Sequence, residues 1–124
     1  MTWTYEQSTG YLTAPDGSLT ASGYSGHPPC VNSPQDQFRS DLGPIPEGAW
    51  TIETPHTDPE KGPVVMALTP AAGTNTFGRS GFLIHGDLIG EAGEHLASHG
   101  CIILAHPVRE EIAASEDKDL QVIP

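Results

Sequence analysis

Short apolar stretches separated by turn residues run through most of this chain, and their spacing predicts a protein built mainly from β-strands. The expected strands occupy residues 3–7, 11–13, 18–24, 49–53, 63–69, 81–86 and 100–104. The turn Pro15-Asp16-Gly17 has the residue types of a tight hairpin connection and separates the second strand from the third. The first quarter of the chain therefore predicts a β-meander.

Residues 25–48 show no sustained period and contain five Pro and three Gly, so they predict a loop. A loop of this length is longer than most connections in compact domains, and such loops often carry function. Its end, Gly43-Pro44-Ile45-Pro46-Glu47-Gly48, is expected to be rigid because each proline fixes its own φ angle.

Helical signals are confined to residues 89–97 and 107–114. Pro107 suits the first turn of the second helix, where Glu110 and Glu111 favour the N-terminal end of the dipole. The last segment, residues 115–124, is acidic and is expected to lie at the surface. The pattern as a whole predicts the mainly β class, a β-rich α+β fold with one or two short helices.

The composition narrows the classes of protein that fit this pattern. With 14 Gly and 12 Pro among 124 residues, a helical bundle is excluded. Lys and Arg number 5 against 16 Asp and Glu, which gives a formal net charge of −11. This charge repels phosphate backbones, so we expect no nucleic-acid partner. At 13.1 kDa the chain has the size of one domain, and we expect residues 1–124 to form a single domain.

The sequence also bears on location. No apolar stretch approaches the length needed to span a bilayer, which argues against membrane insertion. The N-terminus, residues 1–6, lacks the basic region and apolar core of a secretory signal, so we expect synthesis in the cytoplasm without a classical signal peptide. Two cysteines, Cys30 and Cys101, cannot form a disulfide framework, and cytoplasmic synthesis would keep both as thiols.

Residues with catalytic chemistry are concentrated around Cys101. The motif Ser98-His99-Gly100-Cys101 directly precedes an apolar run, and fifteen residues separate its cysteine from His85 in Ile84-His85-Gly86. An imidazole that accepts the thiol proton makes a cysteine nucleophilic, and a preceding glycine lets a substrate carbonyl approach closely. Two adjacent strands would bring His85 and Cys101 together at one end of the sheet. We expect this pair to carry catalysis, whereas Cys30, after Pro28-Pro29 in the long loop, is expected to have no such role.

Two other interpretations of these residues stay open. Potential metal ligands are concentrated in one part of the chain: His85, Asp87, His95, His99, Cys101 and His106. They would suit a zinc hydrolase, although no Glu follows His95 as the helical metallopeptidase motif requires. In the other interpretation the chain is a non-catalytic binding module with functional loops, and Cys101 is a structural thiol beside Ile102.

Ile84-His85-Gly86, followed after a gap by Ser98-His99-Gly100-Cys101, resembles the signature of YkuD-like L,D-transpeptidases, the cysteine enzymes of peptidoglycan. The wider pattern is closer to the compact L,D-transpeptidase-like effectors that type VI secretion delivers. It comprises Gly23-Tyr24-Ser25-Gly26, Gly43-Pro44-Ile45-Pro46-Glu47-Gly48, Arg79-Ser80-Gly81-Phe82 and residues 97–104. The resemblance spans most of the chain and implies the L,D-transpeptidase catalytic fold.

The resemblance also implies a role for each motif residue. Cys101 would be the nucleophile that forms a thioacyl-enzyme, and His85 would be its general base and later the acid for the leaving amine. Ser98 and His99 would shape the pocket. The backbone N–H groups of Gly100 and Cys101 would stabilise the oxyanion.

The cations that bind substrate carboxylates are expected to be Arg79 and Arg109, which flank the motif segments and are typically Arg in the effector pattern. Gly86 is placed with them in the substrate site, and Arg39 in the long loop is a third candidate. Surface ion pairs are the alternative role for these arginines. Larger L,D-transpeptidases carry an Arg two positions after the cysteine, where this chain has Ile103.

The biology implied by the resemblance is that of an antibacterial effector acting in the periplasm of a competitor. Its substrates would be peptidoglycan stem peptides and D-amino acids. It would cleave the bond between the position-three diamino acid and D-Ala, or exchange that D-Ala for another D-amino acid. No cofactor or metal is implied, a cognate immunity protein is a further expected partner, and we expect a monomer. A zinc-dependent cell-wall hydrolase and a non-catalytic cell-wall binding module remain the alternatives.

Overall fold

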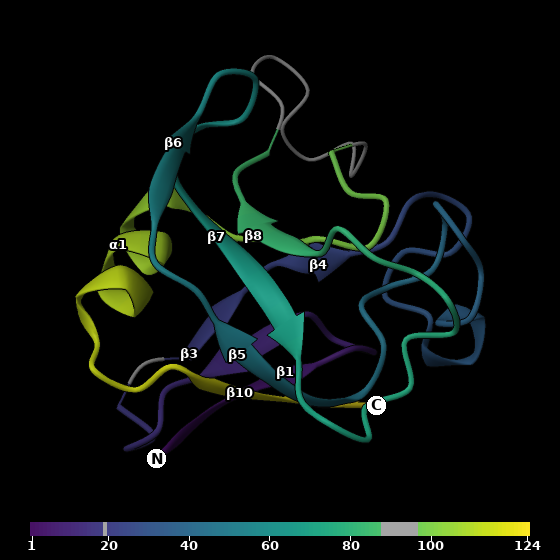
Figure 1. The fold of residues 1–124 in the computed structure, drawn as a ribbon, viewed down its shortest axis with the longest axis horizontal. Helices are drawn as coiled ribbons and strands as arrows, with labels where there is room; N and C mark the ends of the chain where they lie inside the picture. The colour runs from purple at the N-terminus through teal and green to yellow at the C-terminus, as the bar shows by residue number, and fades with distance from the viewer. Residues whose placement is uncertain (19, 88–96) are drawn as a thin grey trace.

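The structure, a computed structural model, describes residues 1–18, 20–87 and 97–124 (Figure 1). These residues contain ten short strands and one α-helix, which confirms the mainly β class. The strands are β1 (Thr2–Glu6), β2 (Tyr11–Thr13), β3 (Thr20–Ser22), β4 (Tyr24–Ser25), β5 (Gly48–Ile52), β6 (His56–Asp58), β7 (Gly62–Pro70), β8 (Leu83–His85), β9 (Ile102–Ile103) and β10 (Asp119–Ile123). The helix α1 covers His106–Ala114, and a short 3-10 helix lies at Pro34–Asp36 within the long loop.

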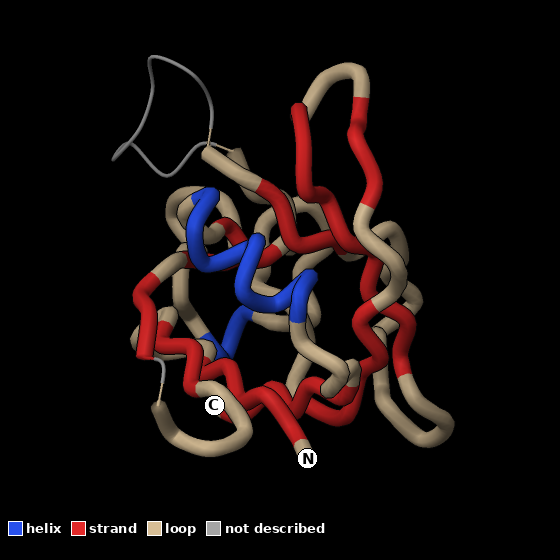
Figure 2. Tube along the Cα trace, turned by 90° about the vertical axis from the view of Figure 1, so that its left-hand side faces the viewer, coloured by secondary structure: helices blue, strands red, loops and turns tan. Residues whose placement is uncertain are grey.

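The strands form one sheet in the order β3-β2-β1-β10-β5-β7-β8-β9-β4, with β6 paired to β7 beside this path. The two ends of this order, β3 and β4, are consecutive in the chain and meet at Gly23, so the sheet curls into a barrel-like shape (Figure 2). Only glycine fits at this junction, since a Cβ on Gly23 would lie 2.0 Å from the carbonyl oxygen of Ile103. The strand expected over residues 18–24 is therefore divided.

The apolar core supports the strand that carries the candidate base. Trp50 of β5 packs edge to face on Phe82, with ring centroids 5.1 Å apart. Phe82 directly precedes β8, so this contact fixes the start of the strand that ends in His85. The helix α1 packs against β7 and buries Ile112 completely.

Strands β8 and β9 lie side by side and run parallel, with Ile84 opposite Ile102 and His85 opposite Ile103. The adjacency of the two motif-bearing strands agrees with the arrangement expected from the sequence. The connection between them includes residues 88–96, which lie outside the described part of the chain. The helix expected over residues 89–97 also falls almost wholly there.

The C-terminal segment departs most from expectation. Residues 115–124 were expected at the surface, but β10 lies between β1 and β5, parallel to the first and antiparallel to the second. Leu120 and Val122 are each only 1% exposed. Leu120 and Val122 alternate with polar residues, which is the pattern of a strand with one buried face. The acidic character of the segment had led instead to the expectation of a surface position. The strand β6 was not expected either. In the described residues no helix has the length and apolar character needed to cross a membrane.

Candidate active site

His85 is the last residue of β8 and is buried, with 3% of its surface exposed. Its Nδ1 lies 2.8 Å from the carbonyl oxygen of Gly86. A carbonyl can only accept a hydrogen bond, so Nδ1 carries the proton and Nε2 is the basic nitrogen. Burial lowers the pKa of His85 below its ordinary value, and the Gly86 hydrogen bond opposes this shift. The side chain is therefore a neutral imidazole held in one tautomer.

Cys101 directly precedes β9, and the parallel register decides where its side chain lies. Ile103 is opposite His85, and Cys101 stands two residues before Ile103, so the strand alternation puts Cys101 on the same face as His85. The thiol is half-buried and donates to the carbonyl oxygen of Gly81 at 3.8 Å. The structure thus places the candidate nucleophile directly before β9 and the candidate base at the end of the neighbouring strand β8.

The electrostatic setting of Cys101 favours the neutral thiol at rest. Burial raises the pKa of the thiol above its ordinary value, while a backbone hydrogen bond from Leu83 and the charges of Lys61 and Arg79 partly offset this rise. Because the pKa of His85 is lowered, the pair stays uncharged near pH 7. Proton transfer from Sγ to imidazole must then accompany attack on a substrate.

Alkylation of Cys101 tests this protonation state. For a neutral thiol with a raised pKa, the rate of iodoacetamide modification is expected to rise about tenfold per pH unit from pH 6 to pH 8, because the thiolate fraction does. Peptide mapping by mass spectrometry separates Cys101 from Cys30, which is 1% exposed. A rate that is level between pH 6 and pH 8 would instead reveal a preformed thiolate–imidazolium pair.

Ser98 shapes the turn that presents Cys101. Its hydroxyl is fully buried, donates to the carbonyl of Cys101 at 2.6 Å, and accepts from the N–H groups of Gly26 at 3.0 Å and Gly100 at 3.1 Å. These three bonds use its full hydrogen-bonding capacity. The Gly100 N–H, expected to serve the oxyanion, is thus occupied by Ser98. No hydrogen bond from the N–H of Cys101 is found among the described residues, which leaves this N–H as the candidate oxyanion donor.

Gly100 has two reasons to lack a side chain. Its φ angle is +134°, a conformation that side chains disfavour, and a Cβ would lie 2.6 Å from Nη2 of Arg79 and 2.9 Å from Phe82. The glycine of the motif therefore lets the Arg79 guanidinium approach the backbone of the turn.

Ser25 is a site residue whose role the sequence did not reveal. Its buried hydroxyl donates to the carbonyl of Gly100 at 2.9 Å and accepts from the N–H of Ile45 at 2.8 Å. It therefore ties β4 to both the catalytic turn and the rigid end of the long loop. The only signal was its place in Gly23-Tyr24-Ser25-Gly26, and a serine there has no chemistry that distinguishes it from other loop serines.

Arg79 was expected to bind substrate carboxylates, but its guanidinium faces inward and is 8% exposed. Nη1 donates to the carbonyls of Gln37 and Pro44, and Nη2 donates to those of Gly43 and His99. All four terminal N–H groups are thereby engaged with backbone oxygens. The side chain also lies 5.0 Å from the ring centroid of Phe82. Arg79 joins the long loop to the catalytic turn.

Arg109 on α1 is equally buried but keeps one nitrogen available. Nε donates to the carbonyl of Leu104 at 3.0 Å, and Nη1 donates to the carbonyls of Pro63 at 2.8 Å and Val64 at 3.2 Å. Nη2 has no hydrogen-bond partner among the described residues. It lies 2.7 Å from the point where a Cβ on Gly86 would be, so Gly86 makes room for it.

A cavity of about 1070 Å³ opens beside this arginine and is lined by His85, Gly86, His99 and Arg109. Its size suits a peptide-sized ligand. The third arginine candidate, Arg39, lies elsewhere: it pairs with Asp36 at 3.6 Å and donates to Cys30 Sγ at 3.7 Å.

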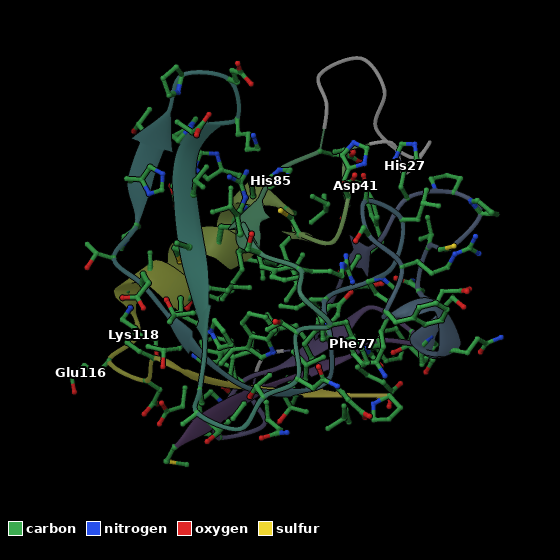
Figure 3. All side chains as sticks on the ribbon, turned by 45° about the vertical axis from the view of Figure 1, so that its right-hand side comes forward. His27, Asp41, Phe77, His85, Glu116 and Lys118 are labelled. Carbon is green, nitrogen blue, oxygen red and sulfur yellow. The ribbon has the colours of Figure 1, made fainter. Side chains whose placement is uncertain are left out.

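His99 is at the rim of the site. Its ring stacks on that of His27, with centroids 4.6 Å apart, and its Nδ1 contacts the carbonyl of Asp41 at 2.9 Å. Figure 3 shows His27, Asp41 and His85 along the same side of the molecule. His99 therefore lies at the entrance of the cavity and contacts the long loop at His27 and Asp41.

The residues considered as metal ligands do not converge in the described part of the chain, where no three His, Cys, Asp or Glu side chains are grouped as a metal ion would require. Asp87 accepts a hydrogen bond from the Tyr24 hydroxyl at 2.7 Å, and His106 pairs with Glu110 at 2.9 Å. His95 falls outside the described residues.

The fold is shared with solved L,D-transpeptidases. An Enterococcus faecium L,D-transpeptidase, solved as its C442S mutant, aligns with a TM-score of 0.62 and 17% identity over 98% of this chain and 49% of that one. Mycobacterium tuberculosis L,D-transpeptidase 1 aligns with a TM-score of 0.57 and 14% identity over 98% of this chain and 58% of that one. The chain thus spans only about half the length of these structures.

The comparison with sequence families is more specific than the shared fold. A search of curated proteins gives no significant match. The family model of the Tlde1 domain, however, matches residues 19–123, which include every residue of the site described above. The chain therefore belongs to the Tlde1 domain family, the type VI L,D-transpeptidase effector family, and is structurally similar to YkuD-like L,D-transpeptidases.

Proposed function

We propose that the protein is a peptidoglycan-acting cysteine acyltransferase that works on the terminal D-residue of stem peptides. The observation that carries this proposal is the parallel register of β8 and β9, which presents Cys101 and His85 from one face of the sheet. The hydrogen bond from His85 Nδ1 to Gly86 supports it, because it leaves Nε2 as the base. Family membership and the shared fold supply the class of substrate.

The first half of the proposed reaction forms a thioester. Sγ of Cys101 attacks the carbonyl carbon that joins the position-three diamino acid to D-Ala, and its proton passes to Nε2 of His85. The C–N bond then breaks, and His85 returns the proton to the amine of the leaving D-Ala. The Cys101 N–H stabilises the negative oxygen of the tetrahedral intermediate.

The second half releases the thioester and depends on the acceptor. Water attacks the thioester carbon to give the shortened stem, whereas the amine of another D-amino acid gives an exchanged stem. In both cases His85 takes the proton of the acceptor, the C–S bond breaks, and the proton returns to Sγ of Cys101. One site therefore supports both L,D-carboxypeptidase and L,D-transpeptidase reactions.

Delivery by type VI secretion into a competitor's periplasm, and neutralisation by an immunity protein, are parts of the same proposal. They follow from membership of the effector family. The net charge of −11 favours a basic inhibitor during encounter.

Mass spectrometry of purified muropeptides tests the proposed reaction. The wild-type protein is expected to convert tetrapeptide stems to tripeptide stems, and to yield D-methionine-terminated stems when D-methionine is added. Stems left unchanged under both conditions would contradict the proposal. A chelator provides the second arm: turnover that is lost with the chelator and restored by zinc would favour the zinc hydrolase, whereas undiminished turnover supports the cysteine mechanism.

A further inference from the structure

Two of the few cationic side chains of this protein line the cavity beside His85. The protein has 5 Lys and Arg residues, and two of them, Lys61 and Arg109, line this cavity. The remaining three are placed otherwise: Arg79 faces inward to four carbonyls, Arg39 pairs with Asp36, and Lys118 contacts the carbonyls of Ile112 and Ala113. In a protein with a net charge of −11, two cationic side chains at one cavity distinguish it from the rest of the protein.

Lys61 reaches the cavity from the turn between β6 and β7. The turn is shaped by Asp58, whose carboxylate accepts the backbone N–H groups of Glu60 at 2.8 Å and Lys61 at 2.9 Å. Its base is held by Arg109, which donates to the carbonyls of Pro63 and Val64. Lys61 and His85 line the same cavity. Burial lowers the pKa of His85 and raises that of Cys101, and the Lys61 charge adds to the first shift and partly offsets the second.

Arg109 lines the same cavity from α1. Its Nη2 is the terminal nitrogen without a partner among the described residues, and it sits over Gly86, next to His85. The helix α1 that carries it begins at the cavity, where Ala105 and His106 are lining residues and no side chain caps the helix N-terminus. The positive end of the helix dipole therefore adds to the two side-chain charges.

Two carboxylates, Glu60 and Asp87, also line the cavity, and Asp58 and Glu110 interact electrostatically with Lys61 and Arg109. Asp87 accepts the Tyr24 hydroxyl at 2.7 Å, and Glu60 is exposed at the tip of the hairpin. No ion pair with Lys61 or Arg109 is found among the described residues. The unpartnered nitrogen of Arg109 and the ammonium of Lys61 are complementary to a carboxylate, which accepts hydrogen bonds from two sides.

We propose that Lys61 and the Nη2 group of Arg109 form a carboxylate-binding site in this cavity, which holds the stem peptide beside His85. The identity of the ligand as a stem peptide rests on the proposed function. This assignment gives Lys61, at the hairpin tip, the role that the sequence suggested for Arg79. The two residues joined by the bond to be cleaved offer one such group each, the terminal carboxylate of D-Ala and the side-chain carboxylate of the position-three diamino acid. Both groups are carboxylates, and peptides that lack one or the other show which of the two is bound.

Calorimetric binding to the Cys101→Ala protein tests the site without turnover. Three tetrapeptides serve as probes: one with both carboxylates, one with a terminal carboxamide, and one with lysine, which lacks the side-chain carboxylate, at position three. Adding Lys61→Met is expected to weaken binding of the first peptide about tenfold. The peptide that lacks the bound carboxylate is expected to bind the Cys101→Ala protein about tenfold more weakly than the first peptide does. Adding Lys61→Met is expected to leave the affinity for this peptide unchanged. Lys61→Arg is expected to restore affinity.

Lys118→Met is the matched control, because it removes the same charge far from His85, as Figure 3 shows. It is expected to leave all three affinities unchanged. Unchanged binding of the first peptide after Lys61→Met, an equal loss in Lys118→Met, or no binding by the Cys101→Ala protein would each overturn the site. Failure of the proposed function is a separate result: peptides would bind with the Lys61 dependence described, but the wild-type protein would release no D-amino acid.

Discussion

Replacing Cys101 with alanine is expected to reduce the release of D-Ala from tetrapeptide stems by at least about a thousandfold, because the acyl group then has no atom to which it can be transferred. The fold is expected to survive. The thiol is half-buried, and its one hydrogen bond, to Gly81, is a long 3.8 Å contact. Its removal is expected to change the free energy of unfolding by no more than about 1 kcal/mol. Timed assays of D-Ala and a thermal melt measure both quantities.

Cys30→Ala is the matched control for this change. Cys30 is the other thiol, it is buried in the long loop, and its sulfur contacts Arg39 rather than the site. This variant is expected to be destabilised by about 1 kcal/mol through lost packing and to keep the wild-type rate. A Cys101→Ala protein that still releases D-Ala at the wild-type rate would exclude the thioester mechanism.

Replacing Arg79 with methionine is expected to have the second largest effect, and on stability as well as rate. Methionine retains much of the apolar stem but orphans the carbonyls of Gln37, Gly43, Pro44 and His99. Buried carbonyls without partners are costly, so the loss in the free energy of unfolding is expected to be about 3 to 5 kcal/mol. The rate is expected to fall about a hundredfold or more, since the turn before Cys101 loses its anchor to the long loop.

Arg39→Met provides the comparison for Arg79. Arg39 is about half exposed, and its ion pair with Asp36 spans 3.6 Å, so removing the charge is expected to change stability by less than about 1 kcal/mol. Chemical denaturation and the D-Ala assay distinguish the two variants. If Arg79→Met were as stable and active as Arg39→Met, the inward guanidinium would have no structural role, and the interpretation of this residue would be wrong.

The sequence predicted the local parts of the site well. His85 and Cys101 each adjoin a short apolar run, so their strands could be located from neighbours in the chain alone. The parallel pairing of those strands agrees with the expected proximity. The helix α1 was likewise expected from Pro107, which lies in its first turn, and it begins one residue before the expected start. Glu110 and Glu111, expected to favour its N-terminal end, lie beyond the first turn.

What could not be predicted depends on contacts between distant segments. Whether Arg79 points to solvent or to four carbonyls is decided by the path of the long loop, which local patterns do not specify. The role of Ser25 requires knowing that β4 closes the sheet beside the catalytic turn. The burial of β10 requires β1 and β5 as neighbours, which lie far away in the sequence. Lys61 was not among the expected site residues, because only the folded hairpin brings it to the cavity that His85 also lines.

The most direct test of the central claim is the intact mass of the protein during turnover. After mixing with excess tetrapeptide stem and rapid acid quenching, the account predicts a mass increase equal to the stem minus its terminal D-amino acid, mapped to Cys101 and absent from the Cys101→Ala variant. An acyl group mapped to another residue, or D-Ala released at the wild-type rate with Cys101 unmodified throughout, would contradict it.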